Sequence, residues 1–203
     1  MQSIKKVVII GPESTGKSSL CEHLAAHYNT IWCPEFAREY LTTNGKKYDF
    51  EDLEIIAKGQ LALEDEYVEK LKSAFEKASE KIIGINPKSI AELPIPNSQI
   101  LFIDTNMYVM KVWCEYVFGK CHLFILDQIV QRKYDLYLLC NIDLPWTADE
   151  LREYPDDKPR QELYNMYQDI LINQQVPWVK ISGNYEERLK EARLAVDKVL
   201  YPS

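Results

Sequence analysis

The chain has 203 residues, of which 46% are hydrophobic and 27% are charged, and its formal net charge is −7. This length and composition indicate a folded domain and exclude a disordered chain. The acidic charge argues against a broad nucleic-acid-binding surface, and no run of about 20 apolar residues indicates a membrane-spanning helix. We expect a single domain over residues 1–203 with no nucleic-acid or membrane partner, and the oligomeric state stays open.

The cysteines and the N-terminal residues are typical of a cytoplasmic protein. The five cysteines, at positions 21, 33, 114, 121 and 140, include no C-x-x-C pair and lie mostly in apolar runs. This pattern favours buried, reduced thiols over disulfides or zinc ligands. Lys6 is followed only by VVII before Gly11, which is shorter than the ~7–15 apolar residues of a signal-peptide core.

Short apolar runs alternate with helical patterns along the chain. In chain order, strands are expected over 5–10, 30–33, 100–103, 136–140 and 177–182. Helices are expected over 17–28, from 36, over 49–82, after 103 through 116, over 159–174 and over 184–200. The alternation predicts an α/β, three-layer doubly wound fold, with a parallel sheet of about five strands and helices on both faces.

The region from 49 to 99 contains the longest helical pattern and a proline-rich segment. An apolar stripe at every fourth residue predicts one long amphipathic helix or a pair; it consists of Leu63, Tyr67, Leu71 and Phe75. Asp49 and Asp52 are expected to cap its start, and Gly59 to mark a break. Residues 84–99 contain three prolines and no periodicity, so we expect a surface excursion there.

A phosphate-binding motif follows the first predicted strand. Gly11, Gly16, Lys17 and Ser18 fit the pattern G-x-x-x-x-G-K-[ST], and a predicted helix follows. In this motif backbone N–H groups surround the phosphates, the lysine reaches the β and γ oxygens, and the hydroxyl holds Mg²⁺. The residues expected to bind ATP here are Gly11, Glu13, Ser14, Thr15, Gly16, Lys17, Ser18 and Ser19.

A phosphate loop serves switches and regulatory ATPases as well as kinases. The N-K-x-D motif of guanine-specific switches is missing after the late strand LYLLC, which leads into NIDLPW. The chain is also too short for the additional sensor subdomains of a ring ATPase. A small-molecule kinase instead needs a second carboxylate near the metal, an acceptor pocket and an arginine-bearing lid that excludes water.

Two carboxylates follow predicted strands and fit the first of these needs. Ligands of parallel sheets gather at the carboxyl ends of the strands, and Asp104 ends the strand ILFI. Asp104 is expected to hold Mg²⁺ or to accept the proton of the acceptor hydroxyl, or alternatively to cap the next helix. Glu35 follows the second strand, with Arg38 three residues later. Glu35 is expected to bind a ribose diol or, as second choice after Asp104, to act as the catalytic base. Arg38 is expected to pair with Glu35 or a phosphate, unless both residues belong to a solvated helix end.

The stretch 143–164 is expected to carry a helical lid, over about 145–166. Arg152 and Arg160 are its candidate phosphate clamps, and Trp146 its candidate surface for a flat base; a solvated pair of helices is the alternative. In the segment ISGNYEER, residues Ser182 and Asn184 are expected near adenine, and Asn184 also predicts a capping box for the last helix.

These segments together resemble one known family. The chain resembles the ribosylnicotinamide kinase module of NadR-type proteins over nearly its whole length. The segments that carry the resemblance are GPESTGKSSL, PEFAREY, FIDTN with KVWCEYVFG, DLPW…LR…R and ISGNYEER. The resemblance implies transfer of the γ-phosphate of ATP, with Mg²⁺, to the 5′-hydroxyl of nicotinamide riboside, giving nicotinamide mononucleotide. It also implies that Asp104 lies in the family's DT[DN] position, Glu35 and Arg38 in its E-x-x-R stretch, and Trp146 and Arg152 in its lid segment.

The chain departs from this family in three places. Glu150 replaces a glycine that is frequent in the family's lid, and the 84–99 excursion is longer than expected. The family's adenylyltransferase motif H-x-G-H is absent, since the three histidines are isolated; they are His23, His27 and His122. The expected substrate is therefore nicotinamide riboside or a related nucleoside, and the expected reaction ends at the mononucleotide. A kinase for another nucleoside or nucleotide is the alternative.

Overall fold

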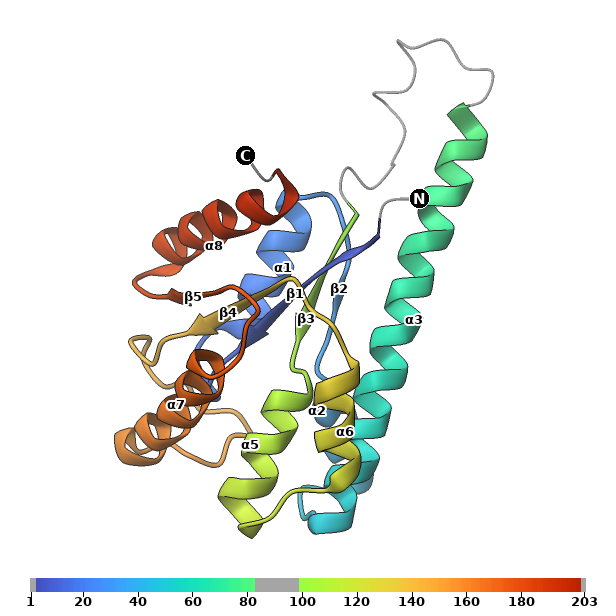
Figure 1. Ribbon diagram of the computed structural model, residues 1–203. Helices are drawn as coiled ribbons and strands as arrows, with labels where there is room; N and C mark the ends of the chain where they lie inside the picture. Colours follow the sequence, from blue (N-terminus) through green and yellow to red (C-terminus); the bar gives the residue numbers. More distant parts are fainter. Residues whose placement is uncertain (1–2, 83–98, 202–203) are drawn as a thin grey trace.

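The computed structural model describes residues 3–82 and 99–201, and its centre is a five-stranded parallel sheet (Figure 1). The strands are β1 (Lys5–Ile10), β2 (Trp32–Cys33), β3 (Ile100–Asp104), β4 (Leu136–Cys140) and β5 (Trp178–Ile181). Their spatial order is β2-β3-β1-β4-β5, so the chain leaves β1 for one edge of the sheet and later returns to its other side. The direction of winding changes around β1, and crevices that bind ligands form at such points.

Helices cover both faces of the sheet, as the alternating pattern predicts (Figure 1). They are α1 (Lys17–His27), α2 (Phe36–Asn44), α3 (Phe50–Ile82), α5 (Met107–Phe118), α6 (Leu123–Gln131), α7 (Asp157–Ile172) and α8 (Tyr185–Leu200). Within β1, Val7 and Ile9 pack in the core against α1 and α8, whereas Val8 and Ile10 pack in the core beneath α3, α5 and α7. This alternation follows from the two-residue period of a strand. The expected α/β doubly wound fold is confirmed.

The long helix α3 is continuous, so the predicted break at Gly59 is wrong. A Cβ at Gly59 would lie 2.1 Å from Cε1 of Phe36, so the glycine makes room for a ring of α2 rather than ending the helix. The predicted cap is confirmed, because the backbone N–H of Asp49 donates to Asp52 and that of Asp52 donates to Asp49. The excursion expected over 84–99 lies outside the described residues, except Gln99.

Other boundaries differ from the sequence prediction at points where local signals are weak. Helix α6 is not among the expected helices; it is nine residues long, and its N-cap residue makes no side-chain cap. The helix expected from Pro159 begins at Asp157. The region expected to form a helical lid is helical only from that residue, and residues 145–156 contain one turn and no helix. The capping box of α8, made by Asn184 and Glu187, is confirmed.

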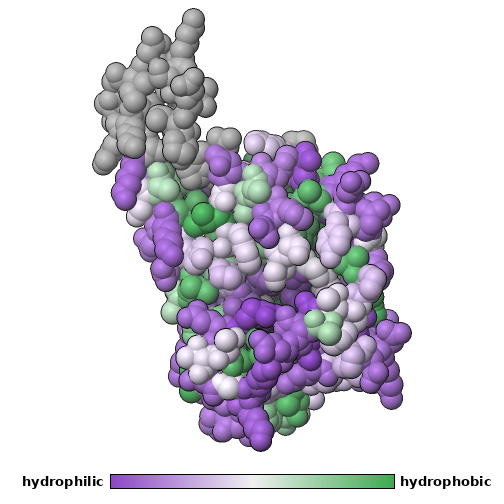
Figure 2. Space-filling view, turned by 180° about the vertical axis from the view of Figure 1, so that it is seen from behind, coloured by the Kyte–Doolittle hydropathy of each residue, from purple (hydrophilic) through white to green (hydrophobic). Residues whose placement is uncertain are grey.

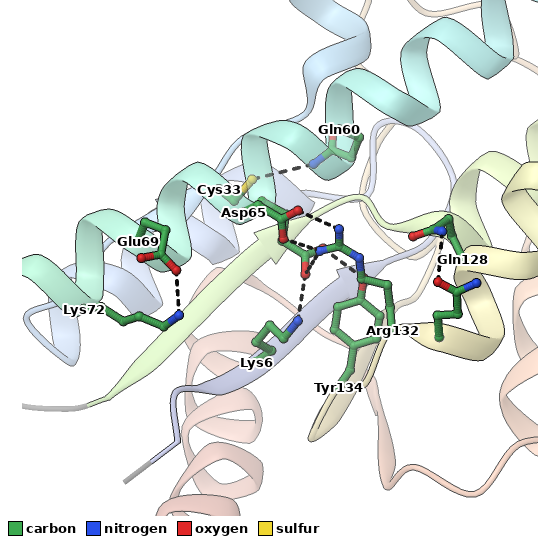
Figure 3. Close-up of polar contacts among 11 residues, drawn as sticks. Lys6, Cys33, Gln60, Asp65, Glu69, Lys72, Gln128, Arg132 and Tyr134 are labelled. Atoms are coloured by element: carbon green, nitrogen blue, oxygen red, sulfur yellow. Dashed lines mark hydrogen bonds and ion pairs between the residues drawn. The ribbon is translucent and has the colours of Figure 1, made fainter. Parts of the chain in front are cut away.

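A buried charged network fixes α3 against the sheet (Figure 3). Glu64 has no exposed surface, and its carboxylate accepts from Lys6 Nζ at 2.9 Å and from the Tyr134 hydroxyl at 2.9 Å. Arg132 approaches the same carboxylate at 3.4 Å and pairs with Asp65. Because a buried charge that loses its partners is costly, this network fixes the position of α3 relative to β1.

The surface is mainly hydrophilic on the face shown in Figure 2, where hydrophobic residues form separate small areas. Over the described part of the chain, no helix combines the length and apolar character needed to cross a membrane.

Candidate functional site

The loop between β1 and α1 has the geometry of a phosphate-binding loop. Gly11 has a φ of +141°, and a Cβ there would lie 2.7 Å from the Cys140 carbonyl oxygen, so this position requires glycine. Thr15 Oγ1 and Lys17 Nζ both donate to the Pro12 carbonyl oxygen, at 2.7 and 2.9 Å. No side chain caps the N-terminus of α1. Its first N–H groups therefore point to an anion-binding role, as at other uncapped helix N-termini.

Arg188 of α8 supports this loop from its outer side, and no motif in the sequence indicates this role. Its side chain is 3% exposed and donates to the carbonyl oxygens of Thr15, Asn141 and Gly183 at 3.0, 3.0 and 2.8 Å. It also pairs with the Asp143 carboxylate. One guanidinium thus joins the phosphate loop, the end of β4 and the loop before α8. Buried charge-assisted bonds of this kind fix backbone geometry.

Asp104 lies beside the phosphate loop, at the carboxyl end of β3. It is 1% exposed and pairs in register with Ile9 of β1. Its Oδ2 accepts from Ser18 Oγ at 2.5 Å, while its Oδ1 is buried without a hydrogen-bond partner. The next residue, Thr105, has a φ of +81°, an unusual backbone for a β-branched residue. The alternative that Asp104 caps the next helix is wrong, because Asn106 is the N-cap of α5.

The half-buried carboxyl group of Glu35 and the buried carboxyl group of Asp104 lie near each other. Glu35 is the N-cap residue of α2, and its Oε1 accepts from Thr105 Oγ1 at 3.5 Å. Burial raises the pKa of Glu35, and the charge of Asp104 raises it further. Burial also raises the pKa of Asp104, against the opposing charge of Lys17 and the hydrogen bond from Ser18. A carboxylate with a raised pKa is a better proton acceptor, as a general base requires.

The pair Ser18 and Asp104 also fits a magnesium ion. Mg²⁺ prefers oxygen ligands and is usually held by one or two protein groups together with phosphates and water. A hydroxyl and a carboxylate meet here, and the unpartnered Oδ1 of Asp104 supplies a further ligand atom. Within residues 3–82 and 99–201 no cluster of three or more His, Cys, Asp or Glu side chains forms a metal site. The arrangement is therefore one that depends on nucleotide phosphates to complete the coordination.

Residues 145–156 lie across the phosphate loop. The Glu13 carboxylate accepts from the backbone N–H groups of Glu153 and Tyr154, at 3.0 Å for the first. Ser14 Oγ accepts from the Thr147 N–H at 2.8 Å and from Arg152 Nη1 at 3.3 Å. Two side chains of the phosphate loop therefore hold this segment closed over the loop.

The opposite edge of the segment is bound to α2 and the loop after it. Arg38 pairs with Asp149 at 3.2 Å rather than with Glu35, and Lys46 pairs with Glu150 at 2.9 Å. The Tyr48 hydroxyl lies 3.0 Å from Glu153 Oε2. Because these pairs are exposed, each contributes little alone, but all of them connect the same two elements.

A cavity of about 230 Å³ is enclosed between the phosphate loop, α2, α5, α7 and the 145–156 segment. Its volume is just below the range of about 300–1,000 Å³ that is common for small-molecule sites. The expected site residues that line it are Glu13, Ser14, Thr15, Gly16, Lys17, Ser18, Ser19, Glu35, Arg38 and Arg152. The structure therefore brings most of the expected residues to one place.

Several expected residues lie outside the cavity lining, among them Asp104, which contacts the lining through Ser18. Arg160 is 3% exposed and donates to the Leu144 carbonyl oxygen at 3.3 Å, where it supports the start of the 145–156 segment. Trp146 is half-buried, and its Nε1 has no hydrogen-bond partner. Ser182 and Asn184 lie in the loop that Arg188 ties to the phosphate loop. Gly11 shapes the phosphate loop without lining the cavity.

Four aromatic residues that the sequence did not assign to the site line the cavity: Trp113, Tyr116, Tyr154 and Tyr167. Trp113 and Tyr116 lie one turn apart on α5, and Tyr116 meets Tyr154 edge to face, with ring centroids 5.4 Å apart. The three-residue spacing of Trp113 and Tyr116 was the signal in the sequence that could have placed them in the site. An aromatic pair with this spacing on a helix more often packs in the hydrophobic core, however. Only the closure of the 145–156 segment over α5 places them in one cavity.

Comparisons with known proteins agree with this geometry. A family model described as an AAA domain matches residues 6–188. The chain belongs to the AAA domain family. The match extends from the first strand through the phosphate loop to Arg188 on α8.

Among individual relatives of this AAA domain, two are bacterial proteins named trifunctional NAD biosynthesis/regulator protein NadR. The protein from Escherichia coli K12 is 24% identical over 186 residues, and that from Salmonella typhimurium is 24% identical over 187 residues. Each alignment covers 91% of this chain but only 40% of the relative. The chain thus spans less than half the length of these relatives, and the expected resemblance to NadR proteins is confirmed.

Solved structures show the same fold. NadR protein in complex with NR superposes with a TM-score of 0.67 at 20% identity, over 98% of this chain and 50% of that one. NadR protein in complex with NAD and AMP-PNP gives 0.64 at 20% identity, with the same coverage. Thymidylate kinase from Ehrlichia chaffeensis gives 0.53 at 14% identity, over 98% of this chain and 100% of that one.

Proposed function

We propose that the chain is a kinase that transfers the γ-phosphoryl group of ATP to the 5′-hydroxyl of nicotinamide riboside. The observation that carries this proposal is the cavity, which joins a phosphate loop, the Glu35 carboxyl group and four aromatic side chains under one closing segment. The buried Asp104 carboxyl group lies next to this cavity and accepts from Ser18 of the lining. We further propose that the chain acts as one domain with residues 145–156 as its lid. Its five cysteines are free thiols, which supports a cytoplasmic location.

The proposed transfer needs little from the protein beyond positioning and charge. The 5′-oxygen forms a bond to the γ-phosphorus, the bond from that phosphorus to the β,γ-bridging oxygen breaks, and ADP leaves. Asp104 accepts the hydroxyl proton, or Glu35 does so in its place, since both have raised pKa values. Lys17 and Arg152 stabilise the charge on the transferring group. Mg²⁺ held at Ser18 and Asp104 would neutralise charge on the β and γ oxygens.

The walls of the cavity favour an acceptor with a flat, positively charged base. The nicotinamide ring of the riboside is a pyridinium cation, and aromatic faces attract cations by about 0.5–2 kcal/mol. Trp113, Tyr116 and Tyr154 supply aromatic rings to the lining, and Glu153 adds a negative charge to it. Uncharged nucleoside bases would gain only the stacking part of this interaction.

The same walls argue against an acceptor that already carries a phosphate. Among the described residues that line the cavity, the cations are Lys17, Arg38 and Arg152. Lys17 and Arg152 belong to the phosphate loop side, and Arg38 is paired with Asp149. A nucleoside monophosphate would need a further cation for its own phosphate, which favours a nucleoside over a nucleotide as the acceptor.

The comparisons support the same acceptor. A NadR protein has been crystallised with NR, and two NadR proteins named for NAD biosynthesis align with 91% of this chain. Because the chain spans 40% of their length, only the kinase step is proposed for it.

ADP release, measured with Mg-ATP and a panel of acceptors, tests the proposal. The panel contains nicotinamide riboside, the common nucleosides and their monophosphates, and nicotinamide riboside should give the highest kcat/KM. Tyr116→Leu should raise the KM for the riboside by about 2- to 30-fold, the equivalent of a lost cation–π contact. The matched control is Tyr201→Leu, at a residue that is 72% exposed beyond α8. Preference for a nucleoside monophosphate, or no acceptor-dependent release, would reject the proposal.

A further inference from the structure

The side chain of Gln60, on α3, extends into the junction between β2 and α2. It is 1% exposed. Its side-chain Oε1 accepts from the Phe36 N–H at 2.7 Å, and its Nε2 donates to the Pro34 carbonyl oxygen at 3.2 Å. Nε2 also approaches Cys33 Sγ of β2 at 3.7 Å, and Figure 3 shows the side chain crossing from α3 toward that strand.

The two bonded backbone groups lie on either side of Glu35. The Pro34 carbonyl belongs to the peptide unit before Glu35, and the Phe36 N–H to the peptide unit after it. Holding both units with one planar amide restricts the two backbone dihedrals of Glu35, which set the direction of its Cα–Cβ bond. The contact therefore acts on the orientation of the Glu35 side chain, although Gln60 does not line the cavity.

Glu35 needs an external restraint at this position. It is the N-cap residue of α2 and makes no side-chain cap. The Phe36 N–H, as the first of the helix, has no partner within its own helix, and Gln60 supplies one. The Glu35 carboxyl group is half-buried, and the charge of Asp104 acts on it; two like charges at close range repel each other. Without a restraint on its backbone, the Glu35 side chain would gain by turning away from the cavity.

Two further features of α3 keep Gln60 in register with this junction. The absence of a side chain at Gly59 lets the Phe36 ring lie directly against the helix, since a Cβ would lie 2.1 Å from that ring. Glu64, one turn after Gln60, is fixed to β1 and to Tyr134 by its buried network. The helix therefore presents a fixed amide to Pro34 and Phe36.

We infer that Gln60 is a positioning residue that holds Glu35 in the orientation required for phosphoryl transfer. This inference rests on the proposed function and deepens it. It states that Gln60, which lies outside the cavity, controls the orientation of the Glu35 carboxylate inside it. A purely structural role would stabilise the fold without acting through Glu35. The two roles differ in how the effect of a Gln60 substitution depends on the residue at position 35.

The test combines a double-mutant cycle with hydrogen exchange. Gln60→Met keeps the length of the side chain and removes both hydrogen bonds; it should lower kcat/KM for the acceptor about 10–100-fold, the scale of a misplaced catalytic group. The KM for ATP should be unchanged. In a Glu35→Gln background the same substitution should cost less than about threefold, because coupled residues are not additive. Gln161→Met, at an exposed position of α7, is the matched control.

Gln60→Glu provides a second variant that keeps the acceptor for the Phe36 N–H and loses the donor to Pro34. Because its carboxylate would be buried against the Pro34 carbonyl oxygen, it should lose at least as much activity as Gln60→Met. Equal losses of activity in the wild-type and Glu35→Gln backgrounds would overturn the inference. Hydrogen exchange needs no acceptor: the Phe36 amide should exchange faster in Gln60→Met, with β1 unchanged, and unchanged protection at Phe36 would also overturn it. If the wild type phosphorylates no acceptor, the proposed function fails. Hydrogen exchange at the Phe36 amide alone then decides whether Gln60 restrains the backbone around Glu35.

Discussion

Replacing Asp104 by asparagine should abolish most activity and yet stabilise the protein without ligands. The substitution keeps the size of the side chain and an oxygen that can accept from Ser18, but it removes a buried charge whose Oδ1 has no partner. Loss of a base or metal ligand costs about 10²–10⁴ in rate. This corresponds to about 3–5 kcal/mol of transition-state stabilisation.

The gain in stability follows from the raised pKa of Asp104. Burial raises the pKa in the folded protein above the value of about 3.9 in the unfolded chain. The unfolded state therefore loses its proton first, so the wild type loses stability as pH rises from about 4 through the folded pKa. Asparagine does not titrate, so the Asp104→Asn variant does not lose stability at this position over this pH range. Removing a destabilising functional group of this kind raises the free energy of unfolding by about 0.5–2 kcal/mol. For a domain of this size, the gain corresponds to about 1–8 °C in Tm.

Thermal unfolding without nucleotide, at pH 5 and pH 8, measures this effect beside the kinase assay. The Tm difference between Asp104→Asn and wild type should be positive at pH 8 and shrink at pH 5. Asp127→Asn, on the exposed surface of α6, is the control and should change neither Tm nor turnover. A variant that keeps most of its turnover would exclude Asp104 as base and metal ligand. A lower Tm at pH 8 would show that the fold stabilises the Asp104 carboxylate, contrary to the argument from burial.

Three further substitutions test other parts of the site. Arg188→Met should weaken ATP binding about tenfold in a nucleotide titration, because it removes about 1–3 kcal/mol of buried bonds that fix the phosphate loop; unchanged affinity would count against that role. Glu13→Ala should raise the KM for the acceptor about tenfold, since it removes the acceptor for two lid N–H groups; an unaltered KM would mean that the lid closes without it. Gly59→Ala should lower stability to denaturant by about 1–3 kcal/mol, because overpacking against Phe36 outweighs the gain in helix propensity; a more stable variant would contradict the crowding.

The features that the sequence predicted well are those with local causes. The phosphate loop depends on glycines at fixed spacing, and the capping box of α8 on Asn184 and Glu187. Continuous apolar runs predicted the buried strands, since both faces of a parallel sheet are covered. Asp104 and Glu35 were located from their positions after strands, because the carboxyl ends of parallel strands meet at one edge.

The features that the sequence missed depend on contacts between distant segments. Gly59 looked like a helix break because its partner, the Phe36 ring, is supplied by another helix. Arg188 belongs to no motif in the sequence, and its role is visible only because three carbonyl oxygens from separate loops converge on it. The pairing of Arg38 with Asp149 could not be predicted either, because it requires the 145–156 segment to close over α2.

The most direct measurement of the central claim is the identity of the product. After incubation with Mg-ATP and nicotinamide riboside, ³¹P NMR and mass spectrometry should show one phosphate ester at the 5′-oxygen of the riboside, formed in a one-to-one ratio with ADP. The same product should be at least about 10²-fold slower to form with Asp104→Asn. Release of ADP with free inorganic phosphate and no phosphorylated riboside would contradict the account and indicate an ATPase instead.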